Sequence, residues 1–431
     1  MFRMTYEPNW ESIDSRPVPQ WFGDAKFGIF MHWGLYSVPA FAPKGKYAEW
    51  YWENLVKKEE YWDFHVRTYG EDFAYQDFVK DFTVEAFDAD EWAQLFADAG
   101  ARYFTITSKH HDGFCLWPSA YSWNWNSVDV GPHRDLLGEL TTAVRKHDAV
   151  KMGFYYSLYE WYHPFYLRDV HEYVDKHMIP QMKEMIERYE PSILFTDGEW
   201  DYPSDVWRST EVLTWMFNEG PRRDELVVND RWGKETRSVH GGYFTTEYGE
   251  VGFGSALTEG RVWEECRGIG ASFGFNRTEV VSDYMSSQEC IHLLINTVSK
   301  GGNLLLNIGP TADGRIPVIQ QERLLDMGAW LKVNSEAIYS TRPWKNRSTN
   351  ENINYTSTPD ALYAICLKWQ GNEIAIDSVT PGASTTVTLL GHDAPLTHKE
   401  ESGSLRVALP NLLVDDMPCQ HAYVIKITDV T

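Results

Sequence analysis

The chain has 431 residues, more than one small hydrophobic core normally contains, so two domains are expected. Its 39 basic and 62 acidic residues give a formal net charge of −23, which disfavours binding to nucleic acid or to an anionic membrane surface. The five cysteines have no CxxC spacing, so the sequence indicates neither a disulfide framework nor a structural zinc site.

Residues 1–340 alternate short apolar runs with amphipathic stretches. Trp92, Leu95, Phe96 and Ala99 have helical spacing, and residues 137–144 and 291–298 repeat it. Strands separated by helices over roughly 300 residues predict an α/β fold of the (β/α)8 barrel type. The Gly-rich segment 248–262 is predicted to be a loop. The eight predicted strands are residues 27–34, 103–111, 152–157, 193–197, 226–230, 242–247, 271–275 and 303–309.

The pattern changes after the barrel. Residues 345–431 contain short, turn-bounded runs in which apolar and polar residues alternate, as in Leu405, Val407 and Leu409, and no helical stripe. This pattern predicts a C-terminal antiparallel β domain, most simply a β-sandwich. Its predicted strands are residues 361–369, 373–379, 385–390, 404–410 and 422–427.

Polar side chains end six of the predicted barrel strands. The carboxyl ends of barrel strands meet at one mouth, where the chemistry of such barrels takes place. Six polar ends at this one pole therefore predict an active site. These strand ends carry His32 and Trp33, His110 and His111, Tyr155 and Tyr156, Asp197, then Asn229, Asp230 and Arg231, and finally Glu247.

Carboxylates at such a mouth match the needs of glycoside hydrolysis, in which one is ionised and the other carries a proton. Asp197 closes a predicted strand. Glu199, two residues later, would point to the same face of that strand, but it lies beyond Gly198, so position favours Asp197 as the site residue. The high aromatic content, 15% of residues, also suits a sugar-binding site.

Other roles for the same residues stay open at this point. Asp197 can cap the following helix, and Glu247 can form a structural ion pair with Arg231. His110, His111 and Asp112 raise the alternative of a metal-dependent hydrolase. Adjacent strand residues point to opposite faces, so both histidines would reach one ion only if the strand breaks at Gly113.

Seven segments resemble a known family. They are "WFGDAKFGIFMHWGLYSVPAF", "SKHHDGFCLWPS", "GFYYSLYEW", "FTDGEW", "VNDRWG", "HGGYFTTEYG" and "SKGGNLLLNIGPTADG". Together they look like the α-L-fucosidases, family 29 of the glycoside hydrolases, over nearly the whole chain and in the same order. The resemblance implies a catalytic barrel with a β-sandwich, a retaining double displacement, and no cofactor or metal.

Position by position, the resemblance implies that Asp197 is the nucleophile and Glu247 the acid/base, with Glu250 and Glu264 as rivals for the second role. Phe195 stands where the family often has tryptophan and should form an apolar wall. The implied fucose contacts are His32, Glu49, Trp50, His110, His111, Arg231 and a tyrosine of "FYYS", with Tyr156 preferred to Tyr155.

The substrate implied by the resemblance is a fucosylated oligosaccharide or glycoside. A non-catalytic carbohydrate-binding protein on the same barrel is the main alternative. The size and acidity of the chain also allow a homo-oligomer. No apolar signal core begins the sequence and no run of about 18 apolar residues occurs, so we expect a cytoplasmic protein. A processed secreted or lysosomal form would have the same sequence.

Overall fold

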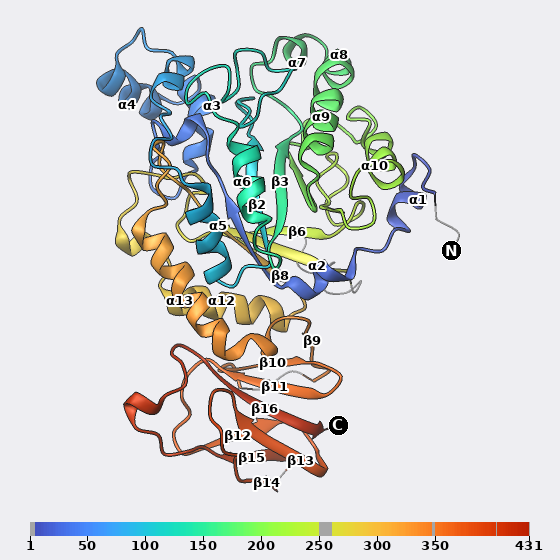
Figure 1. The fold of residues 1–431 in the computed structure, drawn as a ribbon, viewed down its shortest axis with the longest axis vertical. Helices are drawn as coiled ribbons and strands as arrows, with labels where there is room; N and C mark the ends of the chain where they lie inside the picture. Colours follow the sequence, from blue (N-terminus) through green and yellow to red (C-terminus); the bar gives the residue numbers. More distant parts are fainter. Residues whose placement is uncertain (1–4, 250–260, 347–349, 402, 431) are drawn as a thin grey trace.

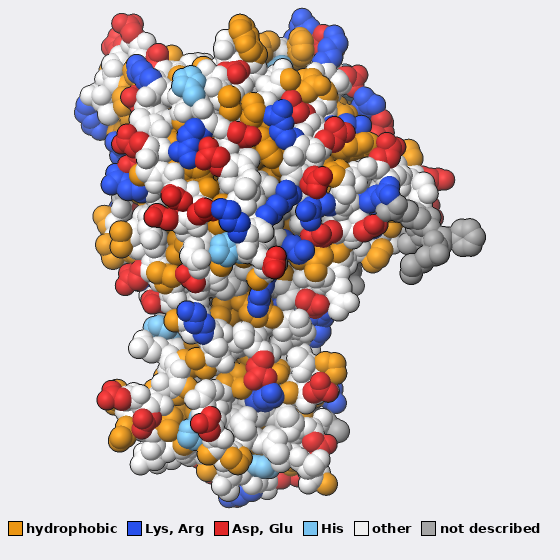
Figure 2. Space-filling view, viewed as in Figure 1, with side chains coloured by type: hydrophobic (Ala, Val, Ile, Leu, Met, Phe, Trp, Pro, Cys, Tyr) orange, Lys and Arg blue, Asp and Glu red, His pale blue; other side chains and the backbone are white. Residues whose placement is uncertain are grey.

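The structure, a computed structural model, describes residues 5–249, 261–346, 350–401 and 403–430. Figure 1 shows a barrel-like α/β body above a smaller all-β body, with the helices around the outside of the barrel sheet. The surface narrows where the two bodies meet, and acidic and basic side chains are interspersed over the visible face (Figure 2). Among the described residues, no helix is long and apolar enough to cross a membrane.

The barrel is a curled eight-stranded parallel sheet in the order β5-β4-β3-β2-β1-β8-β7-β6. Backbone hydrogen bonds from Tyr243 N to Val228 O (3.1 Å) and from Gly242 N to Asn229 O (3.3 Å) join the two ends of this sheet. The strands are β1 (Phe27–Met31), β2 (Tyr103–Lys109), β3 (Lys151–Ser157), β4 (Ile193–Asp197), β5 (Val227–Val228), β6 (Phe244–Glu247), β7 (Trp263–Gly268) and β8 (Asn303–Ile308).

Helices cover the outside of this sheet. Because both faces of the sheet are covered, strands such as β1, β2 and β8 are buried at every position, as is usual for parallel sheets. The helices are α1 (Trp10–Asp14), α2 (Gln20–Ala25), α3 (Tyr51–Leu55), α4 (Glu59–Tyr69), α5 (Ala89–Asp98), α6 (Leu136–Val144), α7 (Pro164–Arg168), α8 (Val170–Tyr173), α9 (Ile179–Tyr189), α10 (Ser209–Asn218), α12 (Ser287–Ser299) and α13 (Val318–Asn334), with a π-helical turn at Val174–Met178.

The C-terminal body consists of two antiparallel sheets that enclose their own apolar core, which confirms the predicted fold class. It packs on the end of the barrel, where Trp330 of α13 donates a hydrogen bond to Ala422 O (2.9 Å). Its strands are β9 (Arg342–Pro343), β10 (Ile353–Ser357), β11 (Ala361–Cys366), β12 (Glu373–Asp377), β13 (Pro381–Leu389), β14 (His398–Glu401), β15 (Ser404–Ala408) and β16 (Tyr423–Val430). The sequence did not predict β9, β10 or β14.

The predicted seventh barrel strand, residues 271–275, is wrong. The strand in that place is β7, Trp263–Gly268, which runs parallel to β6 and β8. The sequence WEECRG of β7 lacks the apolar run that marks the other predicted strands. Glu264 is nevertheless fully buried, and the hydroxyl of Tyr103 donates to its Oε2 (2.6 Å). Burial raises the pKa of Glu264 to about 8.

This buried acid predicts a specific pH dependence of stability. From an ordinary carboxyl pKa near 4.5 up to about 8, the unfolded chain loses the Glu264 proton while the folded protein keeps it. The free energy of unfolding therefore falls as pH rises through this window. Glu264→Gln has no proton to lose at this position. The free energy of unfolding of the variant minus that of the parent should therefore rise by about 3 kcal/mol from pH 5 to pH 8.

The measurement is the thermal unfolding midpoint of both proteins at several pH values. Other titrating groups are common to the two proteins, so the difference between them isolates Glu264. Parallel midpoint curves would mean that Glu264 is ionised in the folded barrel.

Candidate active site

A cavity of about 100 Å³ lies at the mouth of the barrel, where the carboxyl ends of the strands meet. It is lined by Phe30, His32, Tyr47, Glu49, Trp50, His110, His111, Tyr155, Phe195, Asp197, Trp200, Arg231, Glu247, Cys266 and Phe273. The resemblance implied ten site residues, namely Asp197, Glu247, Phe195 and the seven fucose contacts. Nine of these ten line the cavity, and Tyr156 does not.

Asp197 is the last residue of β4 and is only 8% exposed. The hydroxyl of Tyr155 donates to its Oδ2 (2.9 Å), and Nη1 of Arg231 donates to its Oδ1 (2.7 Å). Burial opposes ionisation of the Asp197 carboxyl, but the positive charges of Arg231 and Arg237 outweigh it and lower the pKa to about 2. Asp197 is therefore a carboxylate at neutral pH.

Glu199, the rival acid two residues on, is buried but does not line the cavity. Its Oε1 accepts a hydrogen bond from Nε of Arg237 (2.5 Å). Burial and the neighbouring charge of Asp197 raise the pKa of Glu199. The positive φ of Gly198 (77°) turns the chain between the two acids, which explains why equal parity does not place both in the cavity.

Glu247 ends β6 on the cavity wall, with its side chain 25% exposed. The hydroxyl of Tyr47 donates to its Oε1 (3.1 Å), and Nη2 of Arg231 lies 3.3 Å from its Oε2. One guanidinium thus contacts Asp197 through Nη1 and Glu247 through Nη2. Of the two rivals to Glu247, Glu264 lies inside the barrel below the cavity and Glu250 lies outside the described residues.

Three buried histidines form one wall of the cavity. Burial lowers the pKa of His32 to about 4 and that of His111 to about 3, and it lowers the pKa of His110 well below its usual range. All three rings are therefore neutral at physiological pH. Neutral imidazoles can both donate and accept, which suits the recognition of hydroxyl groups.

The tautomers of two histidines follow from their partners. The hydroxyl of Ser157 donates to Tyr159 O, so it accepts from Nδ1 of His111 (2.7 Å). The amide of Asn307 donates to Phe273 O, so its oxygen accepts from Nδ1 of His32 (2.7 Å). In both rings Nε2 is left with a lone pair, which can accept a hydrogen bond from a ligand hydroxyl.

Glu49 is a second buried acid on the cavity wall. Its Oε2 accepts from Gly274 N (2.8 Å), and burial raises its pKa to about 8. Phe30, Phe195 and Phe273 add an apolar surface to the same cavity, and the rings of Phe30 and Phe273 pack against His32, with centroids 4.7 and 4.9 Å from that of the imidazole. The cavity therefore presents both hydroxyl-binding groups and an apolar surface to a ligand.

The preferred tyrosine of the sequence analysis was the wrong one of the pair. Tyr156 points out of the barrel, where its hydroxyl donates to Oε1 of Gln181 (2.8 Å), while Tyr155 points inward to Asp197. The two tyrosines are separated by the register of the sheet, in which Tyr155 pairs with Phe195 on β4. Phe30, Tyr47, Trp200, Cys266 and Phe273 also line the cavity and were not predicted; of these, Phe30 shares the parity of His32.

The two adjacent histidines reach the same cavity because β2 ends before them, at Lys109. The metal alternative needs a third ligand beside them. Within the described part of the chain, the cluster of three histidine or acid ligand atoms within 4.8 Å is elsewhere, at Glu160, His163 and His177.

The chain matches known protein families over most of its length. Residues 2–336 match the family described as α-L-fucosidase, and residues 345–428 match the α-L-fucosidase C-terminal domain. The chain is 42% identical to an α-L-fucosidase of Branchiostoma floridae, over 100% of this chain and 97% of that protein. It is 43% identical to the human tissue α-L-fucosidase, over 99% of this chain and 92% of that protein.

Solved structures show the same similarity. The Thermotoga maritima α-fucosidase in complex with a mechanism-based inhibitor is 37% identical, with a TM-score of 0.85 over 98% of this chain and 100% of that one. A structure of the same enzyme in complex with fucose has a TM-score of 0.84 at the same coverage.

Proposed function

The chain belongs to the α-L-fucosidase family of glycoside hydrolases, and we propose that it is a retaining exo-glycosidase that releases terminal α-L-fucosyl residues. The observation that carries this proposal is the pair of carboxylates, Asp197 and Glu247, held by one guanidinium at the cavity mouth. A cavity of about 100 Å³ has room for no more than one sugar ring, so the rest of a glycan would remain outside.

In the proposed first step, a carboxylate oxygen of Asp197 attacks the anomeric carbon. The bond from this carbon to the leaving oxygen breaks, and Glu247 gives its proton to that oxygen. A β-fucosyl ester of Asp197 forms. In the second step Glu247 takes a proton from water, which attacks the same carbon and releases α-L-fucose with its configuration retained.

The proposed substrate contacts follow from the polar and the apolar residues that line the cavity. His32, His110, His111 and Glu49 would bind the ring hydroxyls, and Trp50 would pack against the ring. Phe30, Phe195 and Phe273 would enclose the methyl group of fucose, a position where galactose carries a hydroxymethyl group. We assign the catalytic barrel to residues 1–340 and the β-sandwich to residues 345–431.

Asp197→Ala should abolish turnover of an aryl α-L-fucoside, because no ester can form. Added azide should restore consumption of the substrate and give the inverted β-fucosyl azide, which is identified by NMR. Asp197→Asn serves as the isosteric control and should also be inactive. Full activity of Asp197→Ala would refute the assignment of the nucleophile.

Glu247→Ala should slow the reaction by about 10²–10⁴-fold on substrates with a poor leaving group, because general acid help is lost. The loss should be much smaller on an aryl fucoside whose leaving group needs no proton. The measurement is kcat/KM across a series of aryl leaving groups. An equal loss on every substrate would point away from Glu247 as the acid.

Two neighbouring tyrosines offer a matched pair of variants. Tyr155→Phe removes a hydrogen bond to the Asp197 carboxylate and should lower kcat/KM about 10- to 100-fold, as expected for a bond to a charged group. Tyr156→Phe should cost about 1 kcal/mol of stability and leave kcat/KM unchanged. The reverse pattern would restore Tyr156 to the site.

A further inference from the structure

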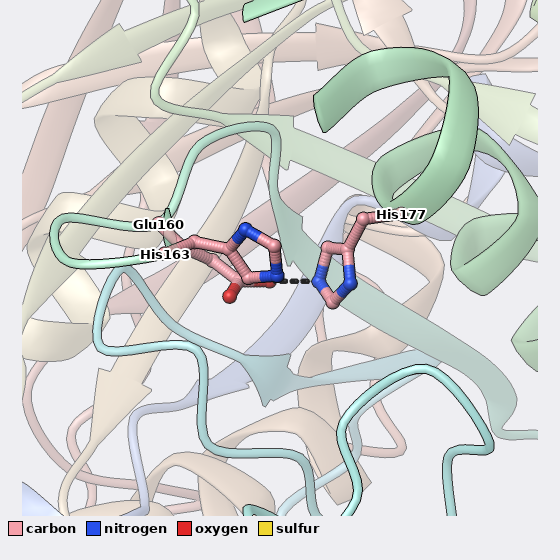
Figure 3. A group of neighbouring side chains, drawn as sticks. All are labelled: Glu160, His163 and His177. Atoms are coloured by element: carbon pink, nitrogen blue, oxygen red, sulfur yellow. Dashed lines mark hydrogen bonds and ion pairs between the residues drawn. The ribbon is translucent and has the colours of Figure 1, made fainter. Parts of the chain in front are cut away.

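A second group of buried ionisable side chains lies behind the histidine wall. Glu160 and His163 come from the loop after β3 and His177 from the π-helical turn, and the three side chains converge (Figure 3). Nε2 of His177 lies 2.6 Å from Oε1 of Glu160. Lys109, the last residue of β2, places Nζ 2.7 Å from the same oxygen. We call these four residues the Glu160 cluster.

The other residues of the Glu160 cluster stabilise the negative charge of Glu160 itself and do not form a metal site. Lys109 offers only donors. His163 accepts a hydrogen bond at Nδ1 from Phe165 N (3.2 Å), and burial lowers its pKa to about 4, so the neutral ring carries its proton on Nε2 and has no lone pair there. Burial opposes ionisation of Glu160, yet His177 and Lys109 hold its pKa well below its usual range. Glu160 is a buried carboxylate next to the Lys109 ammonium group and the imidazole ring of His177.

A β-bulge turns Lys109 toward this cluster. Thr107 of β2 pairs with Tyr155 of β3, but Lys109 pairs with the next residue, Tyr156, so β2 contains one extra residue. Bulges of this kind change the direction of side chains next to active sites. Here the bulge puts Lys109 on the outer face with Tyr156, whose ring centre is 4.1 Å from Nζ.

The ion pair joins the loop that carries His110 and His111 to the loop after β3. Lys109 immediately precedes His110 and His111 in the chain. Glu160 immediately precedes Trp161. The backbone N–H of Trp161 donates to His111 O (2.9 Å), and the centre of its ring lies 5.4 Å from that of His111.

The turn after the histidines also packs directly on Glu160. Gly113 has a φ of 78°, and a Cβ at this position would lie 2.6 Å from Oε2 of Glu160. Any displacement of the carboxylate would therefore be passed to this turn, whose Gly113 N bonds to His110 O (3.0 Å).

We propose that Lys109 and Glu160 are positioning residues for the fucosidase site: their buried ion pair ties the loop after β2 to the loop after β3 and fixes His110 and His111 in the orientation that binds the fucosyl ring. Neither residue lines the cavity, so both act through the histidines. The inference rests on the proposed function.

The test uses the double variant Lys109→Met/Glu160→Gln, which removes both charges and leaves no unpaired charge in the interior. Binding of L-fucose is measured by calorimetry, and kcat/KM is measured on an aryl α-L-fucoside, both well below the unfolding midpoint. We expect L-fucose to bind at least 10-fold more weakly per folded molecule and kcat/KM to fall at least as far. A role in stability alone would lower the midpoint and leave the affinity unchanged.

Lys151→Met is the matched control. Lys151 begins β3, at the far end of the strand that leads to Glu160, and its Nζ lies 2.9 Å from Oε1 of Glu225. Loss of this ion pair should leave the L-fucose affinity at the parent value.

Gly113→Ala provides a second variant, which disturbs Glu160 while keeping every charge, and it should also weaken L-fucose binding. The proposal would be overturned if the double variant bound L-fucose with an affinity within twofold of the parent. If the double variant does not fold, the same result in Gly113→Ala would overturn it. So would a stoichiometric metal ion in the purified parent that is lost in His163→Ala. If the parent itself neither binds L-fucose nor hydrolyses the fucoside, the proposed function fails instead.

Discussion

The site depends on one buried cation between two carboxylates. Arg231 is 2% exposed, and its guanidinium bonds to Asp197, to Glu247 and, through Nε, to the hydroxyl of Thr245 (3.1 Å). Burial alone would push Asp197 toward the neutral form, and the positive charge of Arg231 opposes this. A planar guanidinium with donors fixed in a fork can hold the side chains of Asp197 and Glu247 in place at once, which a lysine could not do with the same geometry.

The neutral histidines complete this electrostatic arrangement. If His32, His110 and His111 were protonated, they would compete with Arg231 for Asp197 and would lose the lone pairs that accept from sugar hydroxyls. Their burial among aromatic rings keeps them uncharged. The aromatic surface thus has two effects: it offers an apolar side to the sugar, and it sets the protonation state of the polar side.

Apolar runs and their polar ends are local patterns, and they predicted the barrel, the second β domain and the lining residues at the strand ends, whereas Glu49, Trp50 and Phe195 came only from the resemblance to the family. The failures of the prediction have a common cause, since side-chain direction at a strand end depends on neighbouring strands. Tyr155 and Tyr156 are equivalent in the sequence, and their register with β4 separates them. The burial of Glu264 on β7 was not predicted either, because its partner Tyr103 is 161 residues distant in the sequence. Phe273 reaches the cavity from a segment wrongly taken for a strand.

Charges buried away from the mouth have a cost that the fold must offset locally. A buried ion pair is seldom more stable than a well-packed apolar pair of the same size, so its presence is weak evidence for a stabilising role. It does fix orientation, because each charge must stay where its partner is. In this barrel Lys109 and Glu160 join the loops beside the histidines, while Glu199 holds Arg237 beside Asp197. Both pairs adjoin the cavity wall, where orientation matters more than an increment of stability.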